Sequence, residues 1–301
     1  YRPGLDEILA EHGLEYFLVD SHALLHADPA PSTGVYAPVR TPAGLLAFAR
    51  DLESAKQVWS SKEGYPGDYN YREYYRDVGF DLDWDYIRDF VHPDGIRINT
   101  GLKYFRITGA GSHKEPYVPA WADERAAGHA GHFLHARWEQ VERLHGEMGR
   151  PPIIVSPYDT ELFGHWWYEG PAFLDYVCRK LHYDQHELEM IAPSDYPYSG
   201  LAPVVDLPES SWGNHGYSSV WLNESNCWVY RHLHAAEERM CALAEGHPHP
   251  STLEKRVLNQ AARELVLAQS SDWTFIISAR TAVDYANRRL QEHLGWFFEL
   301  C

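Results

Sequence analysis

The sequence predicts an α/β part followed by a helical part. Short apolar runs at residues 16–19, 45–49 and 153–155 alternate with helical patterns, and polar residues begin where each run stops. This alternation is typical of a barrel of parallel strands, in which the side chains at the carboxyl ends of the strands face the active site. Beyond Asn226 the pattern becomes helical. We therefore expect a catalytic α/β domain over residues 1–205 and a helical domain over residues 206–301.

The N-terminal elements form one helix-to-strand unit of such a barrel. Leu5, Ile8 and Leu9 share a helical face, and Gly13 is suited to cap the helix before the strand at residues 16–19. The proline-rich segment 26–44 then predicts a long surface loop around one tyrosine, Tyr36. Loops of this length inside a domain are usually functional. Tyr36 is either a lid residue that closes over a substrate or the anchor that fixes the loop.

The next predicted strand, residues 45–49, places Arg50 and Asp51 at its end, and residues 57–59 predict another short extended piece that ends in Trp59. The sequence GYPGD at residues 64–68 predicts a sharp turn. Its Gly67 allows the backbone to approach a ligand hydroxyl, although an ordinary tight turn uses the same residues.

A long helical pattern over residues 120–148 is interrupted near Gly128 and Gly131. His129, His132 and His135 follow at intervals of three, but no carboxylate repeats with them and no HExxH is present. Solvated or packed histidines therefore account for this spacing, and no metal site is expected.

The centre of the prediction is the stretch PPIIVSPYDTELFGHWWYEG, residues 151–170. The β-branched run 153–155 predicts a buried strand, which places Asp159 at its carboxyl tip. An acid at this position, followed by Glu161, a histidine and three large aromatics, suits sugar chemistry, because carboxyl groups transfer protons while flat rings stack on pyranose faces. We expect the surrounding Trp166 and Trp167 and the nearby carboxylates to raise the pKa of Asp159 by desolvation and like charge. The alternative is a packed strand end with core aromatics.

The C-terminal part combines a tryptophan-containing loop with helices. Trp212 and Trp221 lie among small residues in the loop 207–223, which favours a binding role. Asp272 stands between two helical patterns, either as a helix cap or facing a cleft. The predicted helices are residues 171–181, 228–244, 252–267 (opened by a capping box at Ser251) and 279–294.

Composition excludes several partners. With 43 Asp+Glu against 26 Lys+Arg, the formal net charge of −17 argues against nucleic acid and anionic membrane surfaces, and a 14% aromatic content fits a neutral polysaccharide. The four cysteines show no CxxC pair, which gives neither a zinc site nor a disulfide framework and leaves a reducing cytoplasm as the expected compartment.

Four strings together carry a family resemblance: YDTELFGHWWYEGP, GYPGD with YREYYRD, SSWGNHGYSSVWLN and QSSDW. Their order and spacing resemble those of the glycogen branching enzymes of glycoside hydrolase family 57 over essentially the whole chain. The resemblance implies the second half of an incomplete (β/α)7 barrel followed by a helical domain. It also implies a retaining transglycosylation that cuts an α-1,4-glucan and rejoins it through an α-1,6 linkage, without cofactor or metal.

The resemblance assigns roles to individual residues. Asp159 matches the general acid/base, and Tyr36 matches a mobile-loop tyrosine that favours transfer to sugar over transfer to water. Thr281 stands where some members place a glutamine contact, which puts that contact in doubt. The positions that match the lining of the glucan cleft are Arg50, Trp59, Gly67, Trp212, Trp221 and Asp272.

The family's nucleophile is a glutamate in a WLPE motif, and the opening YRPG resembles the residues directly after that motif. We therefore expect the glutamate three residues before Tyr1, in a longer protein of which this chain is the C-terminal part, and we expect residues 1–301 alone to be inactive. Three other functions stay open: a family 57 4-α-glucanotransferase or amylase, an inactive glucan-binding protein, and a metal-dependent carbohydrate deacetylase.

Overall fold

The computed structural model describes residues 1–60, 63–197 and 202–301. They divide into two compact units, residues 2–208 and residues 209–301, the latter together with Tyr1. Within the described residues, none of the helices has the length and apolarity that a membrane span requires.

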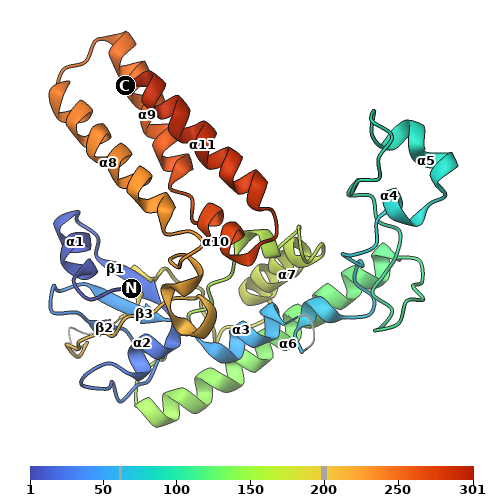
Figure 1. Cartoon of the computed structure of the whole chain (residues 1–301). Helices are drawn as coiled ribbons and strands as arrows, with labels where there is room; N and C mark the ends of the chain where they lie inside the picture. The colour runs from blue at the N-terminus through green and yellow to red at the C-terminus, as the bar shows by residue number, and fades with distance from the viewer. Residues whose placement is uncertain (61–62, 198–201) are drawn as a thin grey trace. The chain divides into compact units, whose positions relative to one another are not determined.

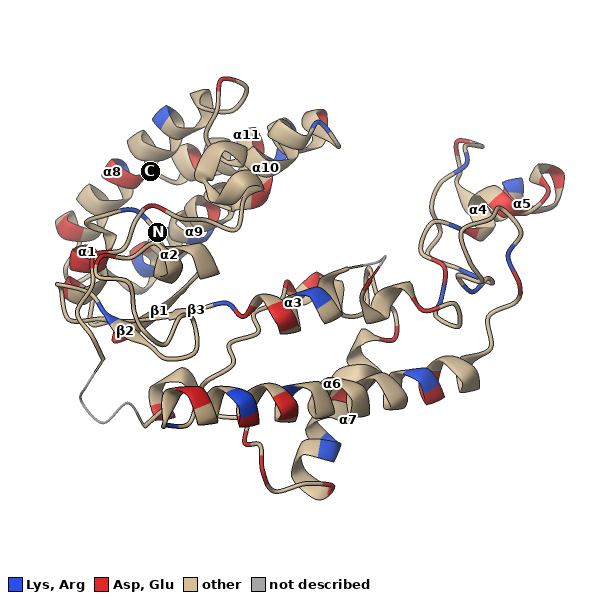
Figure 2. Ribbon diagram, turned by 90° about the horizontal axis from the view of Figure 1, so that it is seen from below, with Lys and Arg blue, Asp and Glu red and all other residues tan. Residues whose placement is uncertain are grey.

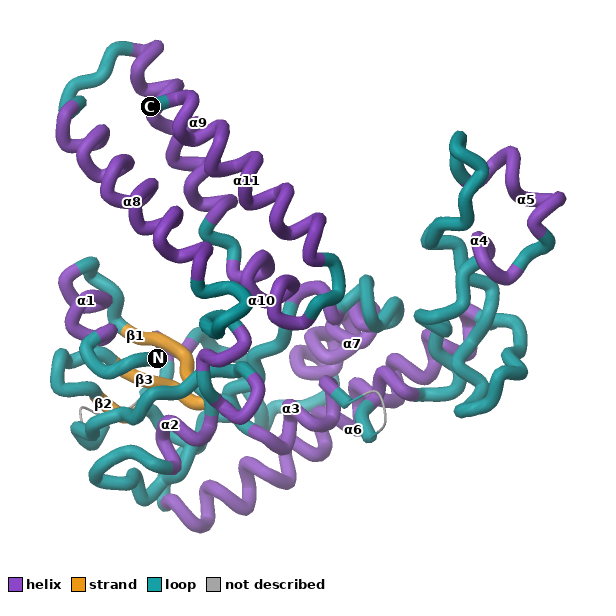
Figure 3. The backbone as a smooth tube through the Cα atoms, in the orientation of Figure 1, coloured by secondary structure: helices purple, strands orange, loops and turns teal. Residues whose placement is uncertain are grey.

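A three-stranded sheet forms one end of the unit 2–208 (Figure 3). Its order is β1 (Tyr16–Val19), β3 (Leu46–Ala49), β2 (Val39–Arg40). Strands β1 and β3 are parallel with Val19 opposite Ala49, while β2 runs antiparallel to β3. Two short helices, α1 (Leu5–Glu11) and α2 (Ser21–Leu25), flank β1 in the chain. Because β1 and β3 end side by side, the residues that follow them emerge at the same edge of the sheet.

Three helices build the main core of this unit. The long helix α6 (Pro119–Met148) lies beside α3 (Leu52–Trp59) and α7 (Gly170–Tyr183) (Figure 1). Buried alanines on α6 allow close approach, and they pack with residues of α3, α7 and the segment between α6 and α7. The outer face of α6 carries interspersed acidic and basic residues (Figure 2). The buried members of this core include Val58, Ala122, Ala126, Ala130, Trp167, Phe173 and Val177.

A small lobe that contains α4 (Val78–Asp81) and α5 (Trp84–Val91) precedes α6. Its fold depends on the carboxylate of Asp77, which is 1% exposed. This carboxylate accepts hydrogen bonds from the backbone N–H groups of Gly79, Thr100 and Gly101 and from the Thr100 hydroxyl. One buried acid therefore connects the start of α4 to a segment more than twenty residues later.

The unit 209–301 consists mainly of α8 (Trp228–Gly246), α9 (Thr252–Ala268), α10 (Ser271–Ala279) and α11 (Val283–Leu300). Helix α11 packs along α9 and also contacts α8 and α10. The predicted capping box is confirmed, with Ser251 and Glu254 each bonded to the other's backbone N–H. The core between the helices includes Val229, Leu233, Ala268, Ile277 and Leu290.

Two predicted strands are wrong. Residues 57–59 belong to α3, because Asp51 caps this helix by accepting from Ser54 N–H, and Ala55 and Val58 fall on its buried face. Residues 153–155 are extended but form no strand ladder. Their backbone makes isolated hydrogen bonds, from Ile153 N–H to Tyr36 O and from Asp51 N–H to Val155 O.

Helix boundaries and one loop also differ from prediction. Helix α6 continues without a break through Gly128 and Gly131. The last helix begins at Val283 because Ala279 ends α10, which the sequence did not predict, and Arg280 adopts a left-handed conformation with φ 56°. The segment 26–44 is not simply a surface loop, since it supplies β2 and buries several side chains.

Candidate functional site

The acidic residue Asp20 and the basic residue Arg50 form an ion pair at the carboxyl ends of the two parallel strands. Asp20 follows β1 and Arg50 follows β3, and Arg50 Nη2 lies 2.5 Å from Asp20 Oδ2. The other carboxylate oxygen of Asp20 accepts from the backbone N–H and the hydroxyl of Ser21, at the start of α2. These bonds fix the position of Asp20, which in turn orients the Arg50 guanidinium.

Asp159 lies near this pair. The extended segment that leads to it is attached to the end of β3 by the 2.8 Å bond from Asp51 N–H to Val155 O. Asp159 is exposed, and the short 3-10 helix Thr160–Leu162 follows it. Partial burial of the carboxyl raises the pKa of Asp159, and the negative charge of Glu161 raises it further, while Arg50 lowers it. An exposed carboxylic acid with a raised pKa can donate a proton at a higher pH than an ordinary aspartate.

The turn after Asp159 orients two adjacent tryptophans differently. Backbone bonds join Trp166 N to Glu161 O and Trp167 N to Leu162 O. Trp167 is 2% exposed and belongs to the core, whereas Trp166 is 48% exposed. Of the aromatic residues predicted around Asp159, Trp167 therefore has a packing role.

Tyr36 lies beside the start of the extended segment rather than at its tip. Its carbonyl accepts from Ile153 N–H at 2.9 Å. Burial raises the pKa of the Tyr36 hydroxyl, and the negative charge of Asp51 adds to this, opposed by the side chain of Gln140. The Tyr36 hydroxyl therefore lies within the electrostatic influence of Asp51 and Gln140.

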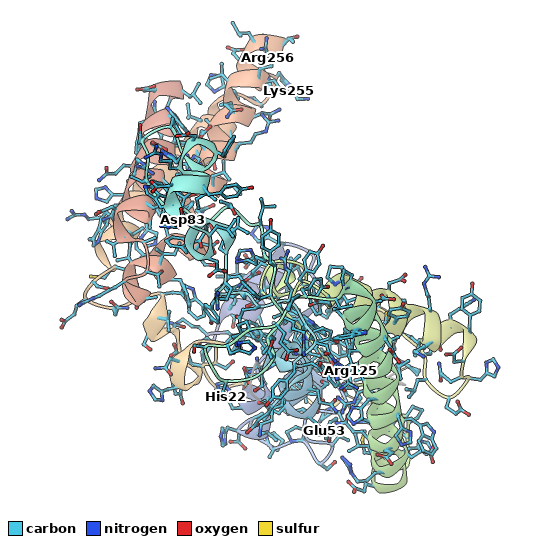
Figure 4. All side chains as sticks on the ribbon, turned by 90° about the vertical axis from the view of Figure 1, so that its right-hand side faces the viewer. His22, Glu53, Asp83, Arg125, Lys255 and Arg256 are labelled. Carbon is cyan, nitrogen blue, oxygen red and sulfur yellow. The ribbon has the colours of Figure 1, made fainter. Side chains whose placement is uncertain are left out.

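Trp59 and Gly67 occupy two further places in the same unit. Trp59 is the last residue of α3 and is 42% exposed. Gly67 lines a cavity of about 540 Å³, together with Asp68, Arg125 and His129. Arg125 lies on α6 (Figure 4) and binds Asp68 at 2.8 Å. Among the described residues, no hydrogen bond or ion pair joins Asp159 to Trp59 or Gly67.

The remaining predicted residues belong to the unit 209–301. Trp212 is 43% exposed, and the indole of Trp221 lies 6.5 Å from the Phe275 ring. Gly213 makes room for this loop, since a Cβ there would lie 2.8 Å from the Trp221 ring. Asp272 is exposed in the first turn of α10 and accepts from the Ser270 hydroxyl, without capping the helix.

The sequence did not reveal what the histidines of α6 do. His129 Nδ1 lies 2.8 Å from the Tyr71 hydroxyl, and His132 Nδ1 lies 2.8 Å from the Tyr65 hydroxyl. Burial lowers the pKa of His129 to about 4, so it is neutral at pH 7. Within the described residues, no group of three or more His, Cys, Asp or Glu is arranged to hold a metal ion.

Comparison with known proteins shows what the chain is similar to. Residues 232–301 match the family model described as 1,4-alpha-glucan branching enzyme, C-terminal. A 1,4-alpha-glucan branching enzyme of Thermococcus kodakarensis is 36% identical over 318 residues, which cover 99% of this chain and 44% of that protein. The solved GH57-type branching enzyme from Pyrococcus horikoshii has a TM-score of 0.79 at 35% identity, over 99% of this chain and 52% of that one. The chain is therefore similar to glycoside hydrolase family 57 branching enzymes over nearly its whole length.

The chain is also similar to a second branching enzyme and to an amylase. A probable 1,4-alpha-glucan branching enzyme of Mycobacterium tuberculosis is 32% identical over 306 residues, covering 97% of this chain and 52% of that protein. The solved alpha-amylase AmyC from Thermotoga maritima has a TM-score of 0.79 at 46% identity, over 100% of this chain and 57% of that one. The chain spans about half the length of the curated relatives it matches.

Proposed function

We propose that this chain carries the acid/base half of a 1,4-α-glucan branching enzyme. The observation that carries the proposal is the position of Asp159, an exposed carboxyl group with a raised pKa next to the Arg50–Asp20 pair. The names of the family 57 relatives support the branching activity. The same proposal assigns β1 and β3 to an incomplete (β/α)7 barrel.

In the proposed reaction, two carboxyl groups act on opposite sides of the glycosidic bond. A glutamate, which the family resemblance places outside residues 1–301, attacks the anomeric carbon of an α-1,4-linked glucan. Asp159 protonates the leaving oxygen and the glycosidic bond breaks. Asp159 then removes the proton from the 6-hydroxyl of an acceptor glucan as that oxygen displaces the glutamate. Retaining enzymes hold these two carboxyl groups about 5 to 5.5 Å apart.

A role for Arg50 in this chemistry is supported by its charge, which lowers the pKa of Asp159. We propose that it orients Asp159 and the bound glucan. We propose that five further residues contact the glucan at sugar residues away from the bond that is cleaved. They are Trp59, Gly67, Trp212, Trp221 and Asp272.

An α-amylase is the second candidate, favoured by the 46% identity to the solved enzyme from Thermotoga maritima. The two functions differ only in the acceptor, since an amylase transfers the glucan to water. Incubation of the full-length protein with amylose separates them. New α-1,6 linkages, detected by a debranching enzyme or by proton NMR, support branching, whereas reducing ends without new linkages support the amylase.

We propose that Tyr36 influences this choice of acceptor, and a substitution tests it. Tyr36→Ala is expected to increase free sugars at the expense of branches, because a lid over the site would otherwise exclude water. The measurement is the ratio of new branch points to reducing ends on amylose. An unchanged ratio together with a lower unfolding midpoint would assign Tyr36 to anchoring the loop alone.

A further inference from the structure

The turn that follows Asp159 presents one aromatic face to solvent. The Trp166 ring stacks on the Tyr74 ring, with centroids 4.5 Å apart and planes 31° apart. His165 packs edge-on against both rings, at 5.2 Å and 5.6 Å. One side of the indole is therefore covered by tyrosine, while Trp166 as a whole remains 48% exposed. We call Tyr74, His165 and Trp166 the aromatic platform.

The platform is rigid for reasons that lie outside it. Trp167 is anchored in the core, and its backbone bonds to Gly164 and Leu162 close the turn on both sides. Lys103 holds Tyr74 in place. Its Nζ donates to the Tyr74 carbonyl at 2.5 Å and lies 5.3 Å from the centre of the Tyr74 ring. The orientation of Trp166 is thus fixed before any ligand arrives, which reduces the entropy lost on binding.

Burial in the core does not explain this exposed indole. The neighbouring Trp167 already fills the core beneath the turn. A large, flat apolar ring that is exposed beside polar groups is typical of a surface that binds a ligand with both apolar and polar faces. A pyranose ring is such a ligand, because its axial C–H bonds form an apolar face and its hydroxyls surround the edge.

The platform is continuous with the candidate active site. Trp166 N–H bonds to the carbonyl of Glu161, whose charge raises the pKa of Asp159. Tyr75, 84% exposed, extends the aromatic surface from the Tyr74 side, with its ring 5.2 Å from that of Tyr74. The acidic chain disfavours an anionic ligand at this surface.

We propose that the aromatic platform is a sugar-binding subsite, on which one pyranose residue of the α-glucan held at Asp159 stacks against Trp166. The inference rests on the proposed function, which supplies the α-glucan as the ligand. It adds a position that binds substrate without taking part in bond cleavage.

Binding of maltoheptaose to the full-length protein, measured by isothermal titration calorimetry, tests this subsite. Trp166→Ala is expected to weaken binding roughly three- to tenfold, because one aromatic stacking contact is lost. Trp166→Tyr keeps a flat ring and is expected to retain most of the affinity. Trp166→Leu keeps apolar volume without a flat ring, so it should weaken binding as Trp166→Ala does. It therefore tests the subsite even if Trp166→Ala folds poorly.

Phe90→Ala is the matched control, since Phe90 is an 87% exposed aromatic residue on α5 and no part of the platform. It should bind maltoheptaose as the unmodified protein does. If Trp166→Ala and Trp166→Leu bind maltoheptaose as Phe90→Ala does, the subsite is refuted while the proposed function stands. If the unmodified protein binds no maltoheptaose and does not act on amylose, the proposed function fails and the subsite fails with it.

Discussion

Asp159→Asn is expected to lower cleavage of amylose by the full-length protein about 10²- to 10⁴-fold, the usual contribution of a positioned general acid/base. The amide has nearly the shape of the acid but cannot exchange a proton with the glycosidic oxygen. Because Asp159 is exposed and no hydrogen bond of its side chain is present among the described residues, we expect folding and glucan affinity to change little. Steady-state rates and calorimetric affinity, measured side by side, check both parts.

The pH dependence of the same reaction provides a sharper form of this test. The proton-donating form of Asp159 is lost as the pH rises through its pKa, so a raised pKa extends activity toward higher pH. Glu161→Gln removes a charge that raises this pKa, and the alkaline limb of the rate profile should therefore move to lower pH. Retained turnover in Asp159→Asn, or a limb that does not move in Glu161→Gln, would remove Asp159 from the role of acid.

Local signals predicted several elements correctly. The strands at residues 16–19 and 46–49 followed from short apolar runs, and the capping box at Ser251 from its two polar residues. The position of Arg50 at the end of the strand was also predicted. In each case the information lies within a few residues of the chain.

Longer-range packing was not readable in this way. Residues 57–59 look extended, yet they form a helix because Asp51 caps it and Val58 meets the alanines of α6. The sequence predicted solvated or packed histidines on α6, but it did not predict their tyrosine partners about sixty residues away. The platform depends on a stack between Tyr74 and Trp166, which are 92 positions apart in the numbering. Such contacts are decided by tertiary structure and leave no local pattern.

Asp51 presents the largest expected effect on stability. Its carboxylate is 1% exposed, accepts from Ser54 N–H at the start of α3 and from Gln140 Nε2 on α6, and lies 3.6 Å from the Arg137 guanidinium. Asp51→Ala removes the cap of α3 and leaves Arg137, itself 7% exposed, with Glu53 as its remaining acidic partner. Breaking a buried charge pair in this way costs about 3–5 kcal/mol. Urea unfolding of the full-length protein should show this loss in the transition of the unit that contains α3 and α6.

The exposed ion pair between Arg143 and Glu53 separates the effect of burial on stability from the effect of charge alone. Arg143 is half exposed and lies 3.5 Å from Glu53, so Arg143→Ala should cost about 0.2–1 kcal/mol, as exposed ion pairs do. Asp51→Asn should lose an amount of stability between that of Arg143→Ala and that of Asp51→Ala. The amide keeps an oxygen that can accept from Ser54 N–H, but it loses the charge that faces Arg137. A loss for Asp51→Ala no larger than that for Arg143→Ala would show that Gln140 and Arg137 find other partners. In that case the junction of α3 with α6 would depend on the apolar contacts of Val58 and the α6 alanines alone.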